Sequence, residues 1–162
     1  MPQPPRPTPS RPAPTAARPP SHGTRRGVGI RLEVDSDPAR LGEVRKQIEA
    51  FAAAAGFAER AVADLGLSVN EAMANVIRHA YSGATDRPIV VTADLDDCDA
   101  VQVRVKIRDW GNGVNPLNRP PPPFDPTRPG GLGLVCLKEL MDEVVFTPQP
   151  DGMLLTMMKR KS

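Results

Sequence analysis

The sequence predicts an α+β fold, a two-layer sandwich in which helices pack on one face of a mixed, mostly antiparallel sheet. Apolar residues alternate with polar residues in several short segments, as in half-buried strands, and recur at helical spacing in longer segments. Two turn-like segments, each between alternating runs, indicate hairpins. After a proline-rich start, about 135 residues remain, which is enough for one sheet and its covering helices.

The first 26 residues are predicted to form a disordered tail rich in proline and arginine. They contain no acidic residue and too little apolar surface to fold. Because no aromatic residues lie between the arginines, a solubilising extension is favoured over a nucleic-acid arm. We therefore expect a single folded domain over residues 27–162 and assign no function to the tail.

Composition excludes several classes of protein. The net charge of +2 provides no global field that would select nucleic acid or a membrane as a direct partner. Cys98 and Cys136 are the only cysteines, which excludes a disulfide-rich scaffold or a four-cysteine zinc site. The start lacks the apolar core of a signal peptide, and no apolar stretch approaches the ~18 residues of a membrane-spanning helix. We expect a cytoplasmic protein.

The folded part is predicted to begin with one strand followed by two helices. Ile30, Leu32 and Val34 alternate with charged residues, and Asp35 or Ser36 is then expected to cap a helix. The apolar residues at helical spacing are Leu41, Val44, Ile48, Phe51 and Ala52 in the first helix and Val62, Leu65, Val69, Met73 and Val76 in the second. The second helical region is expected to end near Tyr81.

The second half is predicted to contain two hairpins separated by a loop and a helix. The residues expected on the buried strand faces of the first hairpin are Ile89, Val91, Ala93 and Leu95, followed by Val101, Val103, Val105 and Ile107. These strands should pair around residues 96–99. A proline-rich loop over residues 114–129 leads to a helix at about residues 132–141, and a final hairpin turns at Asp151 and Gly152.

The second helix carries a polar face beside its apolar stripe. Glu71, Asn75 and His79 follow one another at four-residue spacing, which stacks a carboxylate and an amide one turn apart. An inward-pointing Asn can give one oxygen to magnesium while a neighbouring Glu acts on a hydroxyl or water. A solvated polar face is the alternative interpretation of this spacing.

Asp109 follows the buried positions of its strand rather than the charged ones. Continuing the parity of Val105 and Ile107 directs this carboxylate inward, although it could instead cap a turn after the strand has ended. Gly111 and Gly113 follow, where a backbone without Cβ can turn sharply or approach a flat ligand. An acid beside a glycine turn is suited to binding an adenine amine.

A glycine-rich run directly precedes the last predicted helix. Gly130, Gly131 and Gly133 come before and beside Leu134, so free backbone N–H groups and the positive end of the helix can face phosphate oxygens. Alone, such a run is as often a simple helix entry.

In this order, the three motifs resemble those of the GHKL superfamily of ATP-binding domains, which includes type II topoisomerases, chaperones, histidine kinases and mismatch-repair ATPases. The chain is most similar to the anti-sigma-factor serine kinase branch. Its N-box resembles Glu71, Asn75, His79, Ala80 and Tyr81, its first glycine box Asp109, Gly111 and Gly113, and its second Gly130, Gly131, Gly133 and Leu134. The resemblance covers about residues 28–160 and implies a histidine-kinase-like ATPase fold.

The resemblance also implies a role for each motif. Asn75 would coordinate Mg²⁺, Asp109 would recognise the adenine amine of ATP, and Glu71 would be the catalytic base toward a partner's serine. The implied nucleotide-binding residues are Asn75, His79, Asp109, Gly111, Gly113, Gly130, Gly131, Gly133 and Leu134. The proline-rich lid over residues 114–129 departs from the more mixed lid of the family, which leaves lid closure and turnover open.

The leading functional hypothesis is an ATP- and Mg²⁺-dependent serine kinase that phosphorylates an anti-sigma-factor antagonist and sequesters a sigma factor, as a homodimer. The alternative is a regulatory module in which bound ATP orders the lid for a protein partner without phosphoryl transfer. A topoisomerase-like or chaperone-like ATPase is not expected, because the chain ends directly after the sheet. A sensor histidine kinase is not expected either, because no helical phosphoacceptor domain fits before residue 28.

Overall fold

The computed structural model describes residues 29–97, 100–112 and 133–162. Its strands are β1 (Ile30–Asp35), β2 (Pro88–Asp96), β3 (Gln102–Asp109), β4 (Glu143–Gln149) and β5 (Gly152–Arg160). Its helices are α1 (Leu41–Ala54), α2 (Glu59–Asn75) and α3 (Gly133–Leu140), with a 3₁₀ turn η1 (Pro38–Arg40) before α1 and a π-helical turn η2 (Val76–Ala80) after α2.

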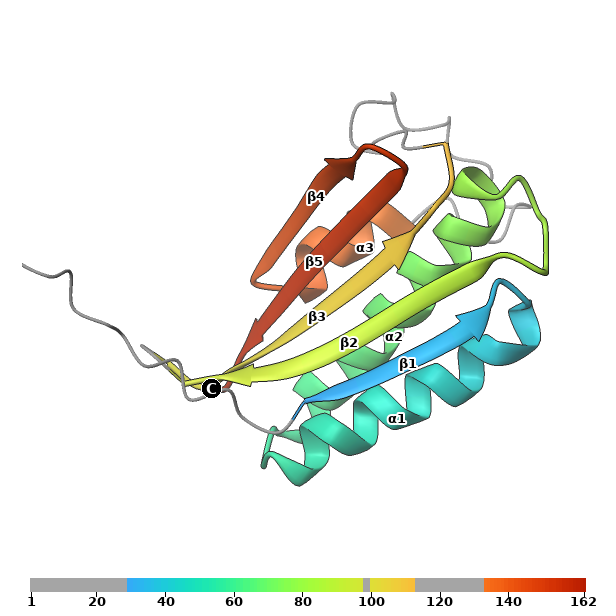
Figure 1. The fold of residues 1–162 in the computed structure, drawn as a ribbon. Helices are drawn as coiled ribbons and strands as arrows, with labels where there is room; N and C mark the ends of the chain where they lie inside the picture. The colour runs from blue at the N-terminus through green and yellow to red at the C-terminus, as the bar shows by residue number, and fades with distance from the viewer. Residues whose placement is uncertain (1–28, 98–99, 113–132) are drawn as a thin grey trace, which may run out of the picture.

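The architecture is a two-layer α+β sandwich. The strands form one sheet in the order β1-β2-β3-β5-β4, and all three helices lie on the same face of it (Figure 1). The predicted fold class is confirmed, and the pairings between described strands are all antiparallel. Both predicted hairpins are present, β2 with β3 and β4 with β5.

The core fills the space between the helices and the sheet. The predicted apolar stripes supply it, because positions three and four apart on a helix share a face and alternate positions on a strand share a face. The residues with no exposed surface include Val44, Ile48, Leu65, Val69 and Met73 from the helices and Ile89, Val91, Val103, Val105 and Met157 from the strands. Burial of each such side chain stabilises the fold by about 1.5–3 kcal/mol.

The helix cap after β1 was predicted too early in the chain. Asp37 accepts the hydrogen bond from the Ala39 N–H (2.9 Å) at the start of η1. Asp35 is still part of β1, and Ser36 is fully buried. The Ser36 hydroxyl donates to the Ala84 carbonyl and accepts from the Arg87 N–H (3.1 Å), so it ties β1 to the segment before β2 instead of capping a helix.

The second helical region changes its hydrogen bonding before it ends near Tyr81. Regular α2 stops at Asn75, and in η2 the Tyr81 N–H donates to the Val76 carbonyl five residues earlier (3.0 Å). Single π-helical turns of this kind recur at functional sites. The segment that carries His79 and Ala80 is therefore wound differently from the helix that carries Glu71.

Central strand β3 positions the residue of greatest chemical interest. Its exposure alternates at every position, and Asp109, the last residue, falls on the buried side at 4% exposed. Asp109 lies between Ile89 of β2 and Met153 of β5 in the strand register. The inward direction predicted for this carboxylate is confirmed.

The predicted tail and the boundary at residue 27 lie outside the described residues and stay predictions. Within the described part, no helix is long and apolar enough to span a membrane.

Candidate functional site

A pocket opens between the two layers, beside the end of β3. Its lining residues are Ala72, Asn75, Val76, His79 and Ala80 from α2 and η2, Asp109 from β3, Leu137 from α3, Phe146 from β4, and Met153 and Leu155 from β5. The space measures about 490 Å³ when the part open to solvent is included. Most of the wall is apolar, with few polar groups to orient a ligand.

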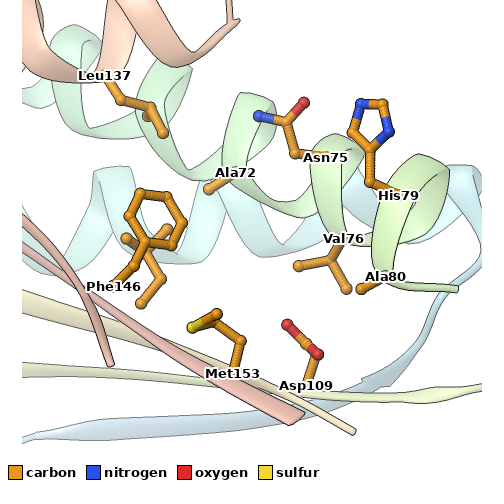
Figure 2. A pocket seen from close by; sticks show the side chains of 10 residues that line it. Ala72, Asn75, Val76, His79, Ala80, Asp109, Leu137, Phe146 and Met153 are labelled. Carbon is orange, nitrogen blue, oxygen red and sulfur yellow. The ribbon is translucent and has the colours of Figure 1, made fainter. Parts of the chain in front are cut away.

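Figure 2 shows how the polar groups are distributed around the pocket. Asp109 rises from the sheet toward Val76 and Ala80, while Asn75 and His79 project from the helical segment on the side away from Asp109. A ligand that contacts both ends must therefore have separate polar groups joined by a part that tolerates apolar walls. A nucleotide has that distribution, because its base and its phosphates lie at opposite ends.

The carboxylate of Asp109 is held by backbone groups. The Gly111 N–H donates to Oδ1 at 2.9 Å. Burial raises the pKa of the Asp109 carboxyl above its ordinary value of 3.8, while the Gly111 N–H, the Arg108 charge and the Met153 N–H act in the opposite direction. The sequence allowed two interpretations of Asp109, a cap of the turn after β3 and a carboxylate directed inward. In the structure the side chain does both. Burying a carboxylate is costly unless donors surround it, so a ligand amine would be a favourable addition.

Gly111 permits the close approach of the turn after β3 to η2. A Cβ at this position would lie 2.5 Å from the Ala80 carbonyl oxygen and 2.6 Å from the Ala80 Cβ. No side chain fits there without moving one of the two segments. Gly111 is not among the pocket-lining residues. It shapes the pocket indirectly, because the close approach that it permits allows both Asp109 and Ala80 to line the pocket.

Three buried side-chain atoms of α2 lack hydrogen-bond partners among the described residues: Ser68 Oγ, Glu71 Oε2 and Asn75 Nδ2. The other end of the Asn75 amide, Oδ1, accepts from Arg78 at 3.3 Å. His79 lies on the pocket rim, and its carbonyl accepts from Asn112 Nδ2 at 3.2 Å. The structure therefore gathers Asn75, His79 and Asp109 around one pocket, with Glu71 one turn before Asn75 and outside the lining.

The glycine-rich motif is described only in part. Gly113, Gly130, Gly131 and the predicted lid over residues 114–129 lie outside the described residues. Gly133 is the first residue of α3, close to the predicted start of that helix at residue 132, and Leu134 follows it in the first turn. The side chain of Leu134 is also outside the description. The predicted roles of these residues stay predictions.

Sequence reasoning did not single out Leu137, Phe146 or Met153, which form the apolar wall of the pocket. Met153 and Leu155 were predicted only as parts of a strand, and Leu137 as part of a helix. Their signal is ordinary apolar periodicity, which is typical of core residues as well as of ligand-binding walls. Only the strand order, which places β5 and β4 beyond β3, shows that these residues face the same space as Asp109.

A family model described as histidine kinase-like ATPase domain matches residues 34–159. This chain belongs to the histidine kinase-like ATPase domain family. Membership supports the use of ATP by the domain, and it confirms the resemblance predicted from the three motifs.

Relatives of this ATPase domain include proteins named as kinases. The chain is 31% identical over 121 residues to Serine-protein kinase RsbW of Listeria monocytogenes, covering 71% of this chain and 76% of the relative. It is 26% identical over 132 residues to Serine-protein kinase RsbW of Oceanobacillus iheyensis, covering 78% of this chain and 83% of that relative. These relatives match the serine-kinase branch to which the motifs pointed.

A solved structure shares the fold of the ATPase domain. The crystal structure of the RsbU and RsbW domains of a Mycobacterium tuberculosis protein aligns with a TM-score of 0.57 at 22% identity. The alignment covers 83% of this chain and 32% of that longer chain.

The buried carboxyl generates a prediction about pH. Because its pKa is raised in the folded state, the folded protein retains a proton that the unfolded chain has already lost just above pH 3.8. The free energy of unfolding of the wild type should therefore fall, relative to that of Asp109→Asn, as the pH rises from 3.8 to the raised pKa, and the difference should be constant above it. Urea unfolding of both proteins at a series of pH values measures this. A difference that rises with pH would mean that the hydrogen bonds to the carboxylate outweigh its desolvation, and a flat difference would mean that the two effects balance; either would contradict the raised pKa.

Proposed function

We propose that this protein is an ATP-dependent anti-sigma factor that phosphorylates a serine of an anti-sigma-factor antagonist protein and sequesters a sigma factor. The observation that carries the kinase part is the pair of buried, unpartnered polar atoms on α2, Glu71 Oε2 and Asn75 Nδ2, placed one helical turn apart beside a pocket with Asp109 at its other end. The relatives named serine-protein kinases support the same reaction class.

Unpartnered buried polar atoms are expensive. Each costs about 1–3 kcal/mol, so such atoms are rare in folded proteins and call for a ligand, ion or water as partner. Glu71 and Asn75 are on the same helix face, and Glu71 Oε2 and Asn75 Nδ2 both lack a partner, although Asn75 Oδ1 accepts from Arg78. Three such atoms along one helix, with Asn75 in the pocket lining, support a site completed by a ligand rather than a solvated polar face.

Asp109 would define the base end of the site. Its buried carboxylate would accept a hydrogen bond from the exocyclic amine of adenine, between the apolar surfaces of Val76 and Met153. Guanine presents a carbonyl at that position of the ring, so a carboxylate acceptor would discriminate against it. The base end would thereby select ATP and direct its phosphates toward α2 and the start of α3.

The residues present fit a magnesium ion bound together with the phosphates. Among the described residues no group of three His, Cys, Asp or Glu side chains could hold a metal alone, and magnesium usually keeps water and phosphate ligands beside one or two protein oxygens. The Asn75 amide can present an oxygen where Nδ2 is buried, because a half-turn of the side chain exchanges the two atoms. When bound, Mg²⁺ would neutralise charge on the phosphates.

Glu71 would act as the base toward the serine. Its carboxylate would take the hydroxyl proton while the serine oxygen forms a bond to the γ-phosphorus and the bond from that phosphorus to the bridging oxygen of ADP breaks. Such reactions depend mainly on positioning and electrostatic stabilisation. Glu71 lies outside the pocket lining, which is suitable for a group that meets the partner's serine rather than the nucleotide.

Sigma-factor binding and a homodimer complete the proposal. They rest on the resemblance to the anti-sigma-factor branch. The retained sigma factor would be released when the antagonist is unphosphorylated.

The first prediction of this proposal concerns Glu71. Glu71→Gln preserves size and hydrogen bonding but cannot accept a proton, so phosphoserine formation on the antagonist should fall about 10²- to 10⁴-fold. ATP binding and sigma-factor binding should be unchanged. The assay is transfer from labelled ATP with magnesium to candidate antagonists. Glu59→Gln, at the exposed start of the same helix, is the matched control and should keep full activity.

Two results would count against this proposal. Transfer that survives in Glu71→Gln would remove Glu71 from the role of base. A wild type that binds ATP and a partner but transfers phosphate to no antagonist would identify the protein as a non-catalytic ATP-binding regulatory module.

The second prediction concerns the metal. Asn75→Ala removes the proposed oxygen ligand and leaves a good helix former, so stability should change little while the magnesium-dependent gain in ATP affinity is largely lost. Calorimetric titrations with and without magnesium measure that gain. Asn70→Ala on the same helix, away from the pocket lining, is the control. An unchanged magnesium effect in Asn75→Ala would place the metal elsewhere.

A further inference from the structure

Tyr81 joins three segments that are distant in sequence. It directly follows η2, is 6% exposed, and its hydroxyl donates to the Pro88 carbonyl at 2.5 Å. The same hydroxyl accepts from the Trp110 N–H at 2.8 Å. Trp110 is the residue immediately after Asp109, so one phenol connects the end of η2, the start of β2 and the end of β3.

The turn that follows Asp109 is attached to η2 at further points. Gly111 packs against Ala80, and the Asn112 N–H donates to the Ala80 carbonyl at 3.4 Å. The Gly111 N–H in turn holds Asp109 Oδ1. The orientation of the carboxylate therefore depends on the position of the 109–112 backbone, and that backbone is placed against η2.

A second side chain reinforces the contact of Tyr81 with this turn. The guanidinium of Arg87 lies over the Tyr81 ring, 5.3 Å from its centre, and donates to the Trp110 carbonyl at 3.4 Å. Both polar groups of the Trp110 backbone are thus bound, the N–H by Tyr81 and the carbonyl by Arg87. The backbone next to Asp109 is therefore attached at two points to side chains of other segments.

We propose that Tyr81 is a positioning residue for nucleotide-base recognition, because its hydroxyl holds the backbone after Asp109 and so sets the direction of the carboxylate in the pocket. The inference rests on the proposed function, where Asp109 meets the adenine amine. Tyr81 is not among the residues that line the pocket, so it would act through Asp109 and not on the nucleotide.

The chemistry of the phenol suits this role. Burial raises the pKa of the Tyr81 hydroxyl above its ordinary value of 10.0, so at neutral pH it keeps the proton that it donates to Pro88 while accepting from Trp110. Phenylalanine would fill nearly the same volume but leave a carbonyl and an N–H without their partner. Tyr81→Phe should therefore loosen the turn without opening a cavity.

Ser36 provides a matched control. Ser36 is also buried, and its hydroxyl also donates to one backbone carbonyl, that of Ala84, and accepts from one backbone N–H, that of Arg87. None of these contacts involves residues 109–112. The Arg87 backbone, whose side chain meets Trp110, stays bound to Ser36 in the variant, because the Ser36 N–H donates to the Arg87 carbonyl at 2.7 Å. Ser36→Ala should therefore lower stability by a comparable amount without altering the carboxylate, so it separates a positioning effect from a general loss of stability.

The first measurement is amide hydrogen exchange in the ligand-free protein. In Tyr81→Phe the amides of Trp110 and Gly111 should exchange faster relative to the amide of Ile107 in the middle of β3. In Ser36→Ala the same ratios should match the wild type. Unchanged ratios in Tyr81→Phe would overturn the inference whether or not the protein binds ATP.

The second measurement is a double-mutant cycle on ATP affinity. Tyr81→Phe should weaken ATP binding about two- to tenfold in the wild-type background, as expected for one lost hydrogen bond, and should have no further effect in Asp109→Asn. Ser36→Ala should bind ATP as the wild type does. An equal loss in both backgrounds would show that Tyr81 acts independently of Asp109 and would overturn the inference. A wild type that binds no ATP would overturn the proposed function, while selective exchange at Gly111 would still show that Tyr81 holds the Asp109 turn.

Discussion

The burial of one carboxylate between the two layers is the constraint on which the rest of the site depends. Asp109 ends the central strand with 4% of its surface exposed, where desolvation opposes its charge. The fold compensates with backbone donors, chiefly the Gly111 N–H, and that donor is in place only because Gly111 lacks a Cβ that would collide with Ala80. The charge, the glycine and the π-helical turn are therefore parts of one arrangement, and changing any of them changes the others.

This arrangement explains why the two ends of the pocket differ. At the sheet end, the acceptor is rigid and surrounded by apolar walls, which suits recognition of a flat heterocycle with an amine. At the helix end, Glu71 and Asn75 have buried polar atoms without partners among the described residues. Such atoms suit phosphates and a metal ion that bind and are released in each reaction cycle. A site that transfers a phosphoryl group from a nucleotide needs one end that holds the base in place and another end whose polar groups bind the reacting phosphates. The two ends of this pocket fit those two requirements.

Much of the fold could be predicted from periodicity alone. The alternation of Val103, Val105 and Ile107 was enough to place Asp109 on the buried side, because side chains on a strand alternate strictly between faces. The four-residue spacing of Glu71 and Asn75 likewise placed both on one helix face. Local patterns of this kind are recorded in consecutive residues, so a single sequence reveals them.

Contacts between distant segments could not be predicted in this way. The hydroxyl of Ser36 bonds to residues about 50 positions later, and that of Tyr81 to Trp110, 29 positions later. Nothing periodic signals such pairs, and the error in the predicted helix cap arose from assigning Ser36 a local partner. The apolar wall of the pocket was missed for a related reason, since Phe146 and Met153 face Asp109 only through the strand order β3-β5-β4.

The central claim is that the buried carboxylate of Asp109 recognises the base of ATP. Calorimetric titration of the wild type and of folded Asp109→Asn with ATP and with GTP tests it most directly. Loss of one charge-assisted hydrogen bond should weaken ATP binding about ten- to a hundredfold and reduce the preference for ATP over GTP. Unchanged ATP affinity and unchanged preference in Asp109→Asn would contradict the account.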